Sequence, residues 1–251
     1  NCERAVGKGT ICNGGGVYVK GDAETVTTTT FTMDGGTISG CKALGNYGGA
    51  IYAENAAVTI KGTVSACEAK NGGGVSCNGG ARLTMDGRGS ISGCKAETHG
   101  GGVYINGSDA DLTMSGGSIT GCTALQGGGI FFHTGNAFTM NGGTISGCKA
   151  TGNMANGGGV YLNNIKTFSM GGGTISNNTA AYLGGGIYIG SEENPQDKGY
   201  YEITAGKISG NNVIDLYGFG GGIYVPKGRT LHLRNALITG NMASALGGGI
   251  W

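Results

Sequence analysis

One short phrase constrains this chain more than any other feature. Two or three glycines are followed by Val or Ile and usually by an aromatic residue, as in Gly101-Gly102-Val103-Tyr104. The aliphatic residues of the successive copies are Val17, Ile51, Val75, Val103, Ile130, Val160, Ile187, Ile223 and Ile250. A repeat of about 27 residues is typical of solenoids, propellers and arrays, whose units cannot bury an apolar face alone. The fold therefore depends on how the units stack.

Two further phrases recur within each unit. One is apolar-Thr-apolar before a glycine turn, as in Leu83-Thr84-Met85, and the other resembles Ser90-Ile91-Ser92-Gly93-Cys94. Each alternates apolar and polar residues, which is the period of a half-buried strand, and no window has helical spacing. We predict an all-β fold, a right-handed parallel β-helix with three short strands per coil, about 27 residues per coil and eight to nine coils.

The pattern also predicts which side chains point into the core. The first strand contributes the aliphatic residue of the glycine phrase and the residue two positions later. The second row is predicted to hold Phe31/Met33, Val58/Ile60, Leu83/Met85, Leu112/Met114, Phe138/Met140, Phe168/Met170, Tyr201/Ile203 and Leu231/Leu233. The third is Ile38, Val64, Ile91, Ile119, Ile145, Ile175, Ile208 and Ile238. Longer stretches at residues 20–30, 190–200, 151–156 and 212–219 are predicted to bulge at corners.

Competing repeat architectures fit less well. A β-propeller blade needs about 40 residues and four strands, and a leucine-rich repeat needs a leucine framework that this chain lacks. We expect residues 1–251 to form a single β-helix domain. Because both ends fall within a unit, we also expect the chain to be a segment of a longer protein or a polymer.

Composition narrows the function. The 58 glycines follow no three-residue period, which excludes collagen. The 16 basic and 15 acidic residues are scattered, so no basic stripe favours nucleic acid as a partner. No apolar run approaches the roughly 18 residues of a membrane span. No cofactor is predicted, since neither Cys-x-x-Cys nor the calcium-binding nonapeptide occurs.

A Cys or Asn follows the third strand of most units. This predicted structural Cys/Asn ladder consists of Cys41, Cys67, Cys94, Cys122, Cys148, Asn178, Asn211 and Asn241. The cysteines are spaced by one coil and should stack. They could form a buried file of small polarizable side chains, or disulfides, because coils about 4.8 Å apart fall within the Cα range of about 4.4–6.8 Å. A linear file is a poor tetrahedral metal site, so no metal is predicted. Cys77 is predicted to lie in the core.

An aromatic residue follows the aliphatic residue of most glycine phrases. This aromatic file consists of Tyr18, Tyr52, Tyr104, Phe131, Tyr161, Tyr188, Tyr224 and Trp251, interrupted at Ser76. Strand alternation predicts that it points outward. One reading is that stacked rings stabilise neighbouring coils, and the other is that an exposed stripe binds sugar rings or a neighbouring rod. It is the best binding candidate in the sequence.

The third strand is predicted to expose Thr and Ser on its outer face, as at Thr37, Ser39, Thr144 and Ser146. This array resembles the flat faces of ice-binding β-solenoids. Such residues are also ordinary choices for an exposed strand, and Lys207 and Leu237 break the row.

An enzyme would need acid and base groups on one face. Glycoside hydrolysis requires two carboxylates within about 5–10 Å. Asp34 and Asp86 occupy equivalent turn positions two coils apart, and His99, His133 and His232 fall at different positions of the repeat. We therefore predict no catalytic residues and no enzyme activity, with a carbohydrate-active enzyme as an alternative.

The phrase Gly184-Gly185-Gly186-Ile187-Tyr188 and the motif Ile-Ser-Gly-Asn at Ile208 to Asn211 resemble the repeats of bacterial adhesin-like surface proteins. They are also similar to the passengers of polymorphic outer-membrane proteins, although Ile stands here where those repeats have Phe. The resemblance covers essentially the whole chain. It implies an extracellular or cell-surface location and a rod that contacts a host or neighbouring-cell surface protein or glycan.

A second hypothesis follows from the open ends of such a rod. An uncapped β-helix end is an unpaired edge, so copies of the chain could associate head to tail. The alternative function is therefore a self-assembling extracellular filament subunit.

Overall fold

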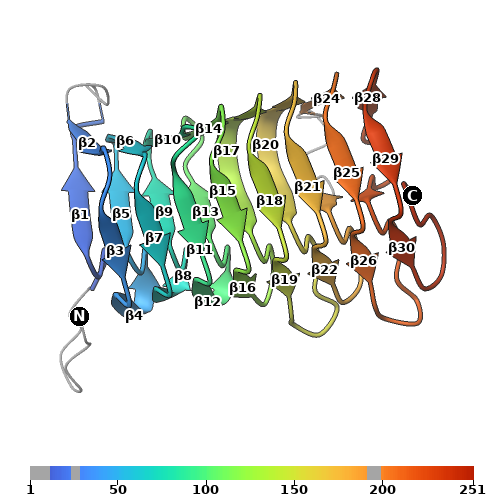
Figure 1. Ribbon diagram of the computed structural model, residues 1–251, viewed down its shortest axis with the longest axis horizontal. Helices are drawn as coiled ribbons and strands as arrows, with labels where there is room; N and C mark the ends of the chain where they lie inside the picture. The colour runs from blue at the N-terminus through green and yellow to red at the C-terminus, as the bar shows by residue number, and fades with distance from the viewer. Residues whose placement is uncertain (1–11, 24–28, 191–198) are drawn as a thin grey trace.

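The strands of successive coils lie side by side and parallel along the length of the molecule (Figure 1). The computed structural model describes residues 12–23, 29–190 and 199–251, and every helix or strand element within them is a β-strand. No helical segment in these ranges has the length and hydropathy of a membrane span. The predicted parallel β-helix is confirmed.

The first two phrases of each unit form one 14-stranded sheet. The glycine phrase leads into β1 (Val17–Lys20), β5 (Ile51–Glu54), β9 (Val75–Asn78), β13 (Val103–Asn106), β17 (Ile130–Met140), β20 (Val160–Met170), β23 (Ile187–Ile189) and β27 (Ile223–Tyr224). The second phrase forms β2 (Thr30–Met33), β6 (Ala57–Ile60), β10 (Arg82–Met85), β14 (Asp111–Met114), β24 (Tyr200–Ile203) and β28 (Leu231–Leu233). Both rows belong to one sheet because β17 and β20 run through both positions.

The third phrase forms an eight-stranded sheet, one strand per coil. Its strands are β3 (Thr37–Ser39), β7 (Thr63–Ser65), β11 (Ser90–Ser92), β15 (Ser118–Thr120), β18 (Thr144–Ser146), β21 (Thr174–Ser176), β25 (Lys207–Ser209) and β29 (Leu237–Thr239). We call its outer surface the hydroxyl face. The three predicted strands are thus all present.

A fourth short strand, which the sequence pattern did not predict, completes each coil. These strands form a second eight-stranded sheet: β4 (Lys42–Tyr47), β8 (Glu68–Asn71), β12 (Lys95–His99), β16 (Thr123–Ala124), β19 (Lys149–Ala150), β22 (Thr179–Ala180), β26 (Asn212–Val213) and β30 (Met242–Ala243). Ala or Val at its inward position keeps this corner narrow, and Ala150, Ala180 and Val213 pack in a small core of their own.

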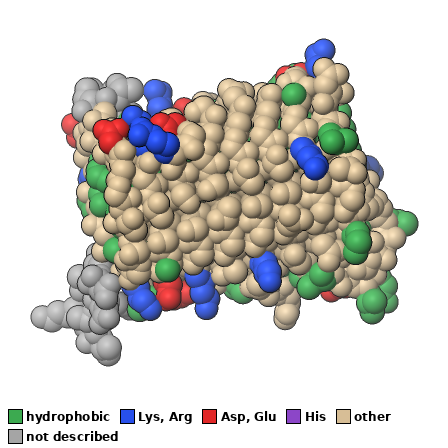
Figure 2. Space-filling model, in the orientation of Figure 1, with side chains coloured by type: hydrophobic (Ala, Val, Ile, Leu, Met, Phe, Trp, Pro, Cys, Tyr) green, Lys and Arg blue, Asp and Glu red, His purple; other side chains and the backbone are tan. Residues whose placement is uncertain are grey.

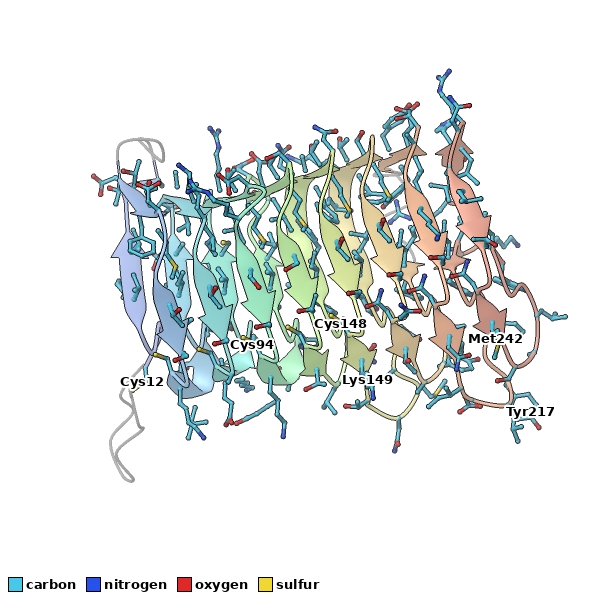
Figure 3. All side chains as sticks on the ribbon, viewed as in Figure 1. Cys12, Cys94, Cys148, Lys149, Tyr217 and Met242 are labelled. Atoms are coloured by element: carbon cyan, nitrogen blue, oxygen red, sulfur yellow. The ribbon has the colours of Figure 1, made fainter. Side chains whose placement is uncertain are left out.

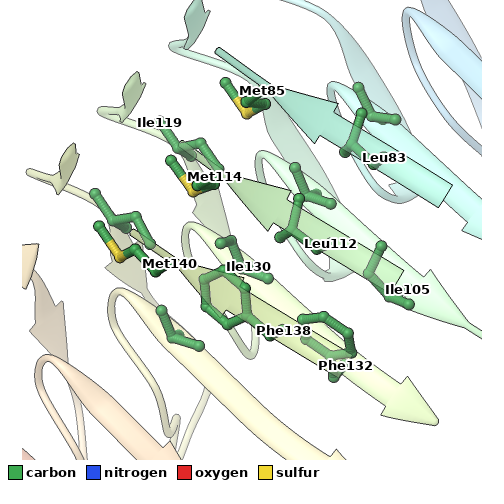
Figure 4. Packing of buried hydrophobic residues seen from close by; sticks show 14 of the residues in the cluster. Leu83, Met85, Ile105, Leu112, Met114, Ile119, Ile130, Phe132, Phe138 and Met140 are labelled. Atoms are coloured by element: carbon green, nitrogen blue, oxygen red, sulfur yellow. The ribbon is translucent and has the colours of Figure 1, made fainter. Parts of the chain in front are cut away.

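The predicted register is confirmed, so like side chains stack on like along the axis. Leu83 pairs with Leu112, and Ile91 pairs with Ile119. Figure 4 shows Met85, Met114 and Met140 as one such row in the continuous buried core. Burying a large aliphatic side chain contributes about 1.5–3 kcal/mol, so this core is the main source of stability.

Leu233 departs from the prediction of an inward, buried side chain. It is exposed, and Leu231 and Ile238, which were predicted to lie in the core of the same coil, are only partly buried. The reason is that β28 pairs with β24 alone among the described strands, so no coil packs on its other side.

The glycine phrase has a steric cause. Gly127 adopts a positive φ of 61°, which L side chains rarely take. A Cβ on Gly128 would lie 2.4 Å from the carbonyl carbon of Lys149 and 2.5 Å from the oxygen of Gly158. Backbones of successive coils approach here too closely for any side chain.

Two of the predicted corner excursions are described in full. Residues 151–156 follow β19, residues 212–219 begin with β26 and continue past it, and both stretches project beyond the neighbouring coils (Figure 1). Of the longer predicted bulges, residues 24–28 and 191–198 lie outside the described residues.

Candidate functional site

The cysteines of the Cys/Asn ladder stack inside the rod, one per coil. Cys67, Cys94, Cys122 and Cys148 are buried, Cys41 is half-buried, and all five thiols are free. The Cys67 thiol donates to the carbonyl of Ser65 at 3.2 Å. Figure 3 shows Cys94 and Cys148 where the hydroxyl-face strands meet the fourth strands. The sequence left open whether these cysteines form a buried file of thiols or disulfides between coils. The structure shows the buried file of free thiols.

The asparagines continue the same row with stronger hydrogen bonds. Asn178 Oδ1 accepts the backbone N–H of Cys148 at 2.9 Å, and Asn178 Nδ2 donates to the Ile145 carbonyl at 3.0 Å. Asn211 repeats this arrangement with the N–H of Asn178 at 3.0 Å. In the cysteine half, the Cys41 N–H points at Cys67 Sγ at 3.4 Å. Cys67, Asn178, Asn211 and Asn241 therefore each accept the corner N–H of the preceding coil.

The other cysteines of the described residues lie apart from the ladder. Cys77 is fully buried in the core, as predicted, and burial raises the pKa of its thiol to about 12. Cys12 is disulfide-bonded. A thiol that stays protonated is a poor nucleophile, so Cys77 is structural.

The aromatic file stacks as predicted. Tyr104 and Phe131 have ring centroids 5.9 Å apart, and the Phe131–Tyr161 and Tyr161–Tyr188 pairs are both 4.5 Å apart. The file continues through Tyr224 to Trp251, whose rings stack at 4.9 Å. Such stacks are favourable by about 0.5–1.5 kcal/mol per pair beyond area burial.

The prediction that this file is exposed is wrong for most of its members. Tyr52, Tyr104, Phe131 and Tyr188 are at most 8% exposed. Tyr161 and Tyr224 are partly buried, whereas Tyr18 is 52% and Trp251 44% exposed. Rings in mid-file have a neighbour on each face, and their outer edges are covered as well.

The covering side chains come from the residue immediately before the glycine phrase. Tyr47 lies 6.3 Å from Tyr52 and 5.8 Å from Tyr104 by ring centroids, and so fills the gap that Ser76 leaves. His99 lies 4.5 Å from Phe131. Sequence reasoning missed this second row because its members share a position but no residue type.

Burial fixes the ionisation of these rings. It raises the pKa of Tyr52 and of Tyr104 to about 12 each. Their hydroxyls are therefore neutral at any physiological pH. Since the mid-file rings are covered, the aromatic file stabilises the coils and does not offer a continuous stripe for sugar rings.

The hydroxyl face is open and almost free of charge. Its outward Thr and Ser side chains are half-buried between neighbouring strands, and Ser118 Oγ donates to Ser90 Oγ at 3.4 Å. Figure 2 shows a broad surface on this side of the molecule, with charged side chains gathered mainly at its edges. The row breaks at Lys207 and Leu237, as the sequence indicated.

Several of the described acidic groups are engaged with nearby partners. Asp34 forms an ion pair with Lys61 at 2.8 Å, and the Lys61 ammonium lowers the pKa of Asp34. Asp86 accepts the backbone N–H of Arg88 at 3.1 Å within its turn. No group of three metal-binding residues occurs in the described part of the chain.

A shallow cleft of about 470 Å³ lies at the fourth-strand corner, beside the aromatic file. Three consecutive coils line it with Thr98, His99, Leu125, Gln126, Thr151, Gly152 and Asn153. No repeat unit contains more than part of this set, so no sequence motif marks the cleft. Only the excursion at residues 151–156 hinted at it.

His99 is the one titratable side chain of the cleft lining. Its Nδ1 lies 3.0 Å from Asn71 Oδ1, which also accepts the Thr98 hydroxyl at 2.6 Å. Because an amide oxygen only accepts, Nδ1 carries the proton and Nε2 keeps its lone pair. Burial lowers the pKa of His99, and electrostatic interactions with His133 and Lys70 lower it further. The imidazole is therefore neutral at neutral pH.

Comparison with known proteins agrees with the architecture. The family model described as the right-handed beta helix region matches residues 8–169 and 90–251. Neither a curated protein nor a solved structure matches the chain. The two overlapping matches span nearly the whole sequence, with the phrases that form the stacked strands, and the chain belongs to the right-handed β-helix family.

Proposed function

We propose that this chain is a non-catalytic, adhesin-like rod located outside the cell or at its surface, where it contacts a glycan or protein of a host or neighbouring cell. The observation that best supports this is the hydroxyl face, which continues along the stacked coils with almost no charge. Loops and faces on a rigid scaffold are common places for recognition.

The chemistry of this face suits neutral, hydroxyl- or amide-bearing partners. Each Thr or Ser hydroxyl can donate one hydrogen bond and accept others. Rows such as Ser90, Ser118 and Thr144 repeat about every 4.8 Å, in register. A glycan or an extended peptide can contact several rows at once, and weak contacts then add up to useful affinity.

The non-catalytic part of the proposal is supported by the pairing of several described carboxylates with basic side chains. Asp34 is paired with Lys61 and Asp111 with Arg82, in contacts that link neighbouring coils. A general acid needs a raised pKa, whereas the pKa of Asp34 is lowered.

Cell and glycan binding by variants of the face test the proposal. We expect the triple variant Thr63→Lys, Ser118→Lys, Thr144→Lys to lose binding to cells and to a glycan array, because the new charges disturb the surface without entering the core. The matched control is Thr84→Lys, Thr113→Lys, Thr139→Lys, on the outward positions of the second strand row. Equal binding by the two triple variants would contradict the role of this face.

The enzyme alternative has its own test. The purified chain should leave a broad panel of plant, bacterial and animal polysaccharides uncleaved. Release of reducing ends or unsaturated products by the chain would overturn the non-catalytic proposal.

A filament subunit is the second candidate. The coil of β28, β29 and β30 exposes Leu233, Leu237 and Met242 on the side that no described strand covers. A second copy could add its own strands there, in head-to-tail association. Sedimentation over a wide concentration range distinguishes the candidates, because a strictly monomeric rod at high concentration excludes the filament.

A further inference from the structure

The cleft at the fourth-strand corner has a wall that is fixed before any ligand arrives. The Thr151 hydroxyl donates to the Ala124 carbonyl at 3.1 Å, and the Gly152 N–H donates to the Leu125 carbonyl at 3.2 Å. The Asn156 N–H donates to Gln126 Oε1 at 2.7 Å. These bonds tie the 151–156 excursion to the coil beneath it. A preformed site avoids the entropy cost of ordering a loop on binding.

The polar groups of the cleft are mostly acceptors. The hydroxyls of Thr98 and Thr151 donate their protons to protein oxygens. Their oxygen lone pairs stay available to accept hydrogen bonds from a ligand. His99 keeps the Nε2 lone pair, because its Nδ1 proton faces Asn71. Gln126 uses its oxygen for the Asn156 N–H, which leaves its amide N–H groups as donors. A complementary ligand therefore carries several hydroxyl donors and at least one acceptor.

The remaining features of the cleft disfavour charged ligands. None of the lining residues is charged when His99 is neutral, so nothing in the cleft neutralises a phosphate or a carboxylate. Leu125 is 45% exposed and offers an apolar patch beside the polar groups. The volume of about 470 Å³ falls within the range of about 300–1,000 Å³ for small-molecule sites.

We infer that this cleft binds a neutral sugar residue, with its C–H face on Leu125 and its hydroxyls on His99, Thr98, Thr151 and Gln126. A pyranose combines these features, since it has an apolar face and a ring of hydroxyl groups. The inference deepens the proposed function and rests on it for its biological context. Because the site is shallow, we expect a Kd on the order of 1 mM for a monosaccharide.

NMR titration of the full chain with methyl glycosides tests the site. The panel holds the neutral methyl glycosides of glucose, galactose, mannose and N-acetylglucosamine, with methyl glucuronide as the charged comparison. We expect at least one neutral glycoside to shift the amide resonances of Leu125, Gln126 and Gly152 with saturation, and methyl glucuronide to bind at least about tenfold more weakly.

Two variants and a matched control assign the binding to the cleft. Thr151→Val and Leu125→Asp should each weaken the Kd by about tenfold or more. Ser244→Ala should not, although Ser244 makes the corresponding bond to the Val213 carbonyl at 3.1 Å, three coils away. Circular dichroism and thermal midpoints verify that each variant is folded.

The inference is overturned if no neutral glycoside causes saturable shifts in the cleft, if the uronide binds best, or if both cleft variants bind like the Ser244→Ala control. Cell binding measured in parallel separates the two ideas. Cell binding that survives Thr151→Val while every glycoside fails leaves the surface rod standing and overturns the sugar site. Saturable glycoside binding without any cell binding supports the cleft and counts against the adhesin-like role.

Discussion

At the residue scale, the glycine phrase depends on close backbone approach more than on flexibility. A Cβ on Gly101 would meet three backbone atoms, the Gly128 oxygen at 2.3 Å and the Thr123 nitrogen and oxygen at 2.5 Å. Gly121, in contrast, has a positive φ of 61° but open space around it. Glycine is therefore required at position 101 by the lack of space for a side chain, and at position 121 by the left-handed backbone conformation.

Substitution of these glycines should therefore differ in cost. We expect Gly101→Ala to destabilise the fold by about 3 kcal/mol or more, because adjacent coils must move apart. Gly121→Ala should cost about 1–2 kcal/mol, the penalty for a left-handed alanine. Urea unfolding followed by circular dichroism measures both, and equal losses would contradict the steric explanation.

The ladder residue Asn178 gives a second residue-scale prediction. Asn178→Ala should cost about 1–3 kcal/mol, because it leaves the buried N–H of Cys148 without its acceptor. Asn178→Cys should cost less, since Cys67 already serves the Cys41 N–H in this way. The urea midpoints of the two variants check the order, and a cysteine variant no more stable than the alanine variant would refute the shared role.

His99 should make stability depend on pH. Its pKa in the fold lies below the ordinary value of 6.5, so the unfolded chain binds a proton more readily. Its contribution is fully present above pH 6.5 and declines as the pH falls from there through the lowered pKa. Thermal midpoints between about pH 8 and pH 5 should therefore fall more steeply for the parent chain than for His99→Gln. Parallel curves would show that His99 is not the group responsible.

At the scale of elements, the strands and their pairing partners could be predicted wherever apolar and polar residues alternate strongly. The phrases around Ile91 and Leu112 predicted their partners correctly because a one-residue slip would turn every apolar side chain outward. The fourth strand was not predicted, because two-residue strands such as Thr123–Ala124 are too short to show an alternating pattern. The aromatic file was placed correctly but its exposure was not, because strand alternation says nothing about Tyr47 and His99 folding over it.

The Cys/Asn ladder predicts a pattern of thiol reactivity. In the native chain a maleimide should label Cys41, which is half-buried, and leave Cys67, Cys94, Cys122 and Cys148 unmodified. In urea all five should react. Mass spectrometry of tryptic peptides locates the label, and Cys41→Ser is the control that should remove native labelling from the ladder. Rapid native labelling of Cys122 would show that the corner opens.

At the scale of the whole molecule, stability comes from the shared apolar core and the ladder, with ion pairs in a minor role. Pairs such as Lys42–Glu68 and Arg234–Glu202 lie on the surface, where solvent and salt screen them. The sequence carries few charges, scattered along its length, which fits this balance. It could not predict the cleft, whose walls come from coils that are separate in the sequence.

Salt should therefore have little effect on folding. We expect the urea midpoint to move less between low salt and about 1 M NaCl than it does on Asn178→Ala, because screening at that concentration removes only weak surface pairs. Potassium chloride serves as the control for ion-specific effects. A large loss of stability in both salts would mean that the ion pairs carry the fold.

The in-register stacking of the hydroxyl face has a consequence for any partner that binds there. A shift of about 4.8 Å along the axis brings one row of hydroxyls nearly onto the next, so a ligand with a matching spacing has several degenerate positions. Because the row breaks at Lys207 and Leu237, the six strands before β25 set the limit, and this degeneracy can multiply the apparent affinity by at most about six. A bound chain could also step from one position to the next without dissociating, which would let the rod hold a partner firmly while leaving it free to slide.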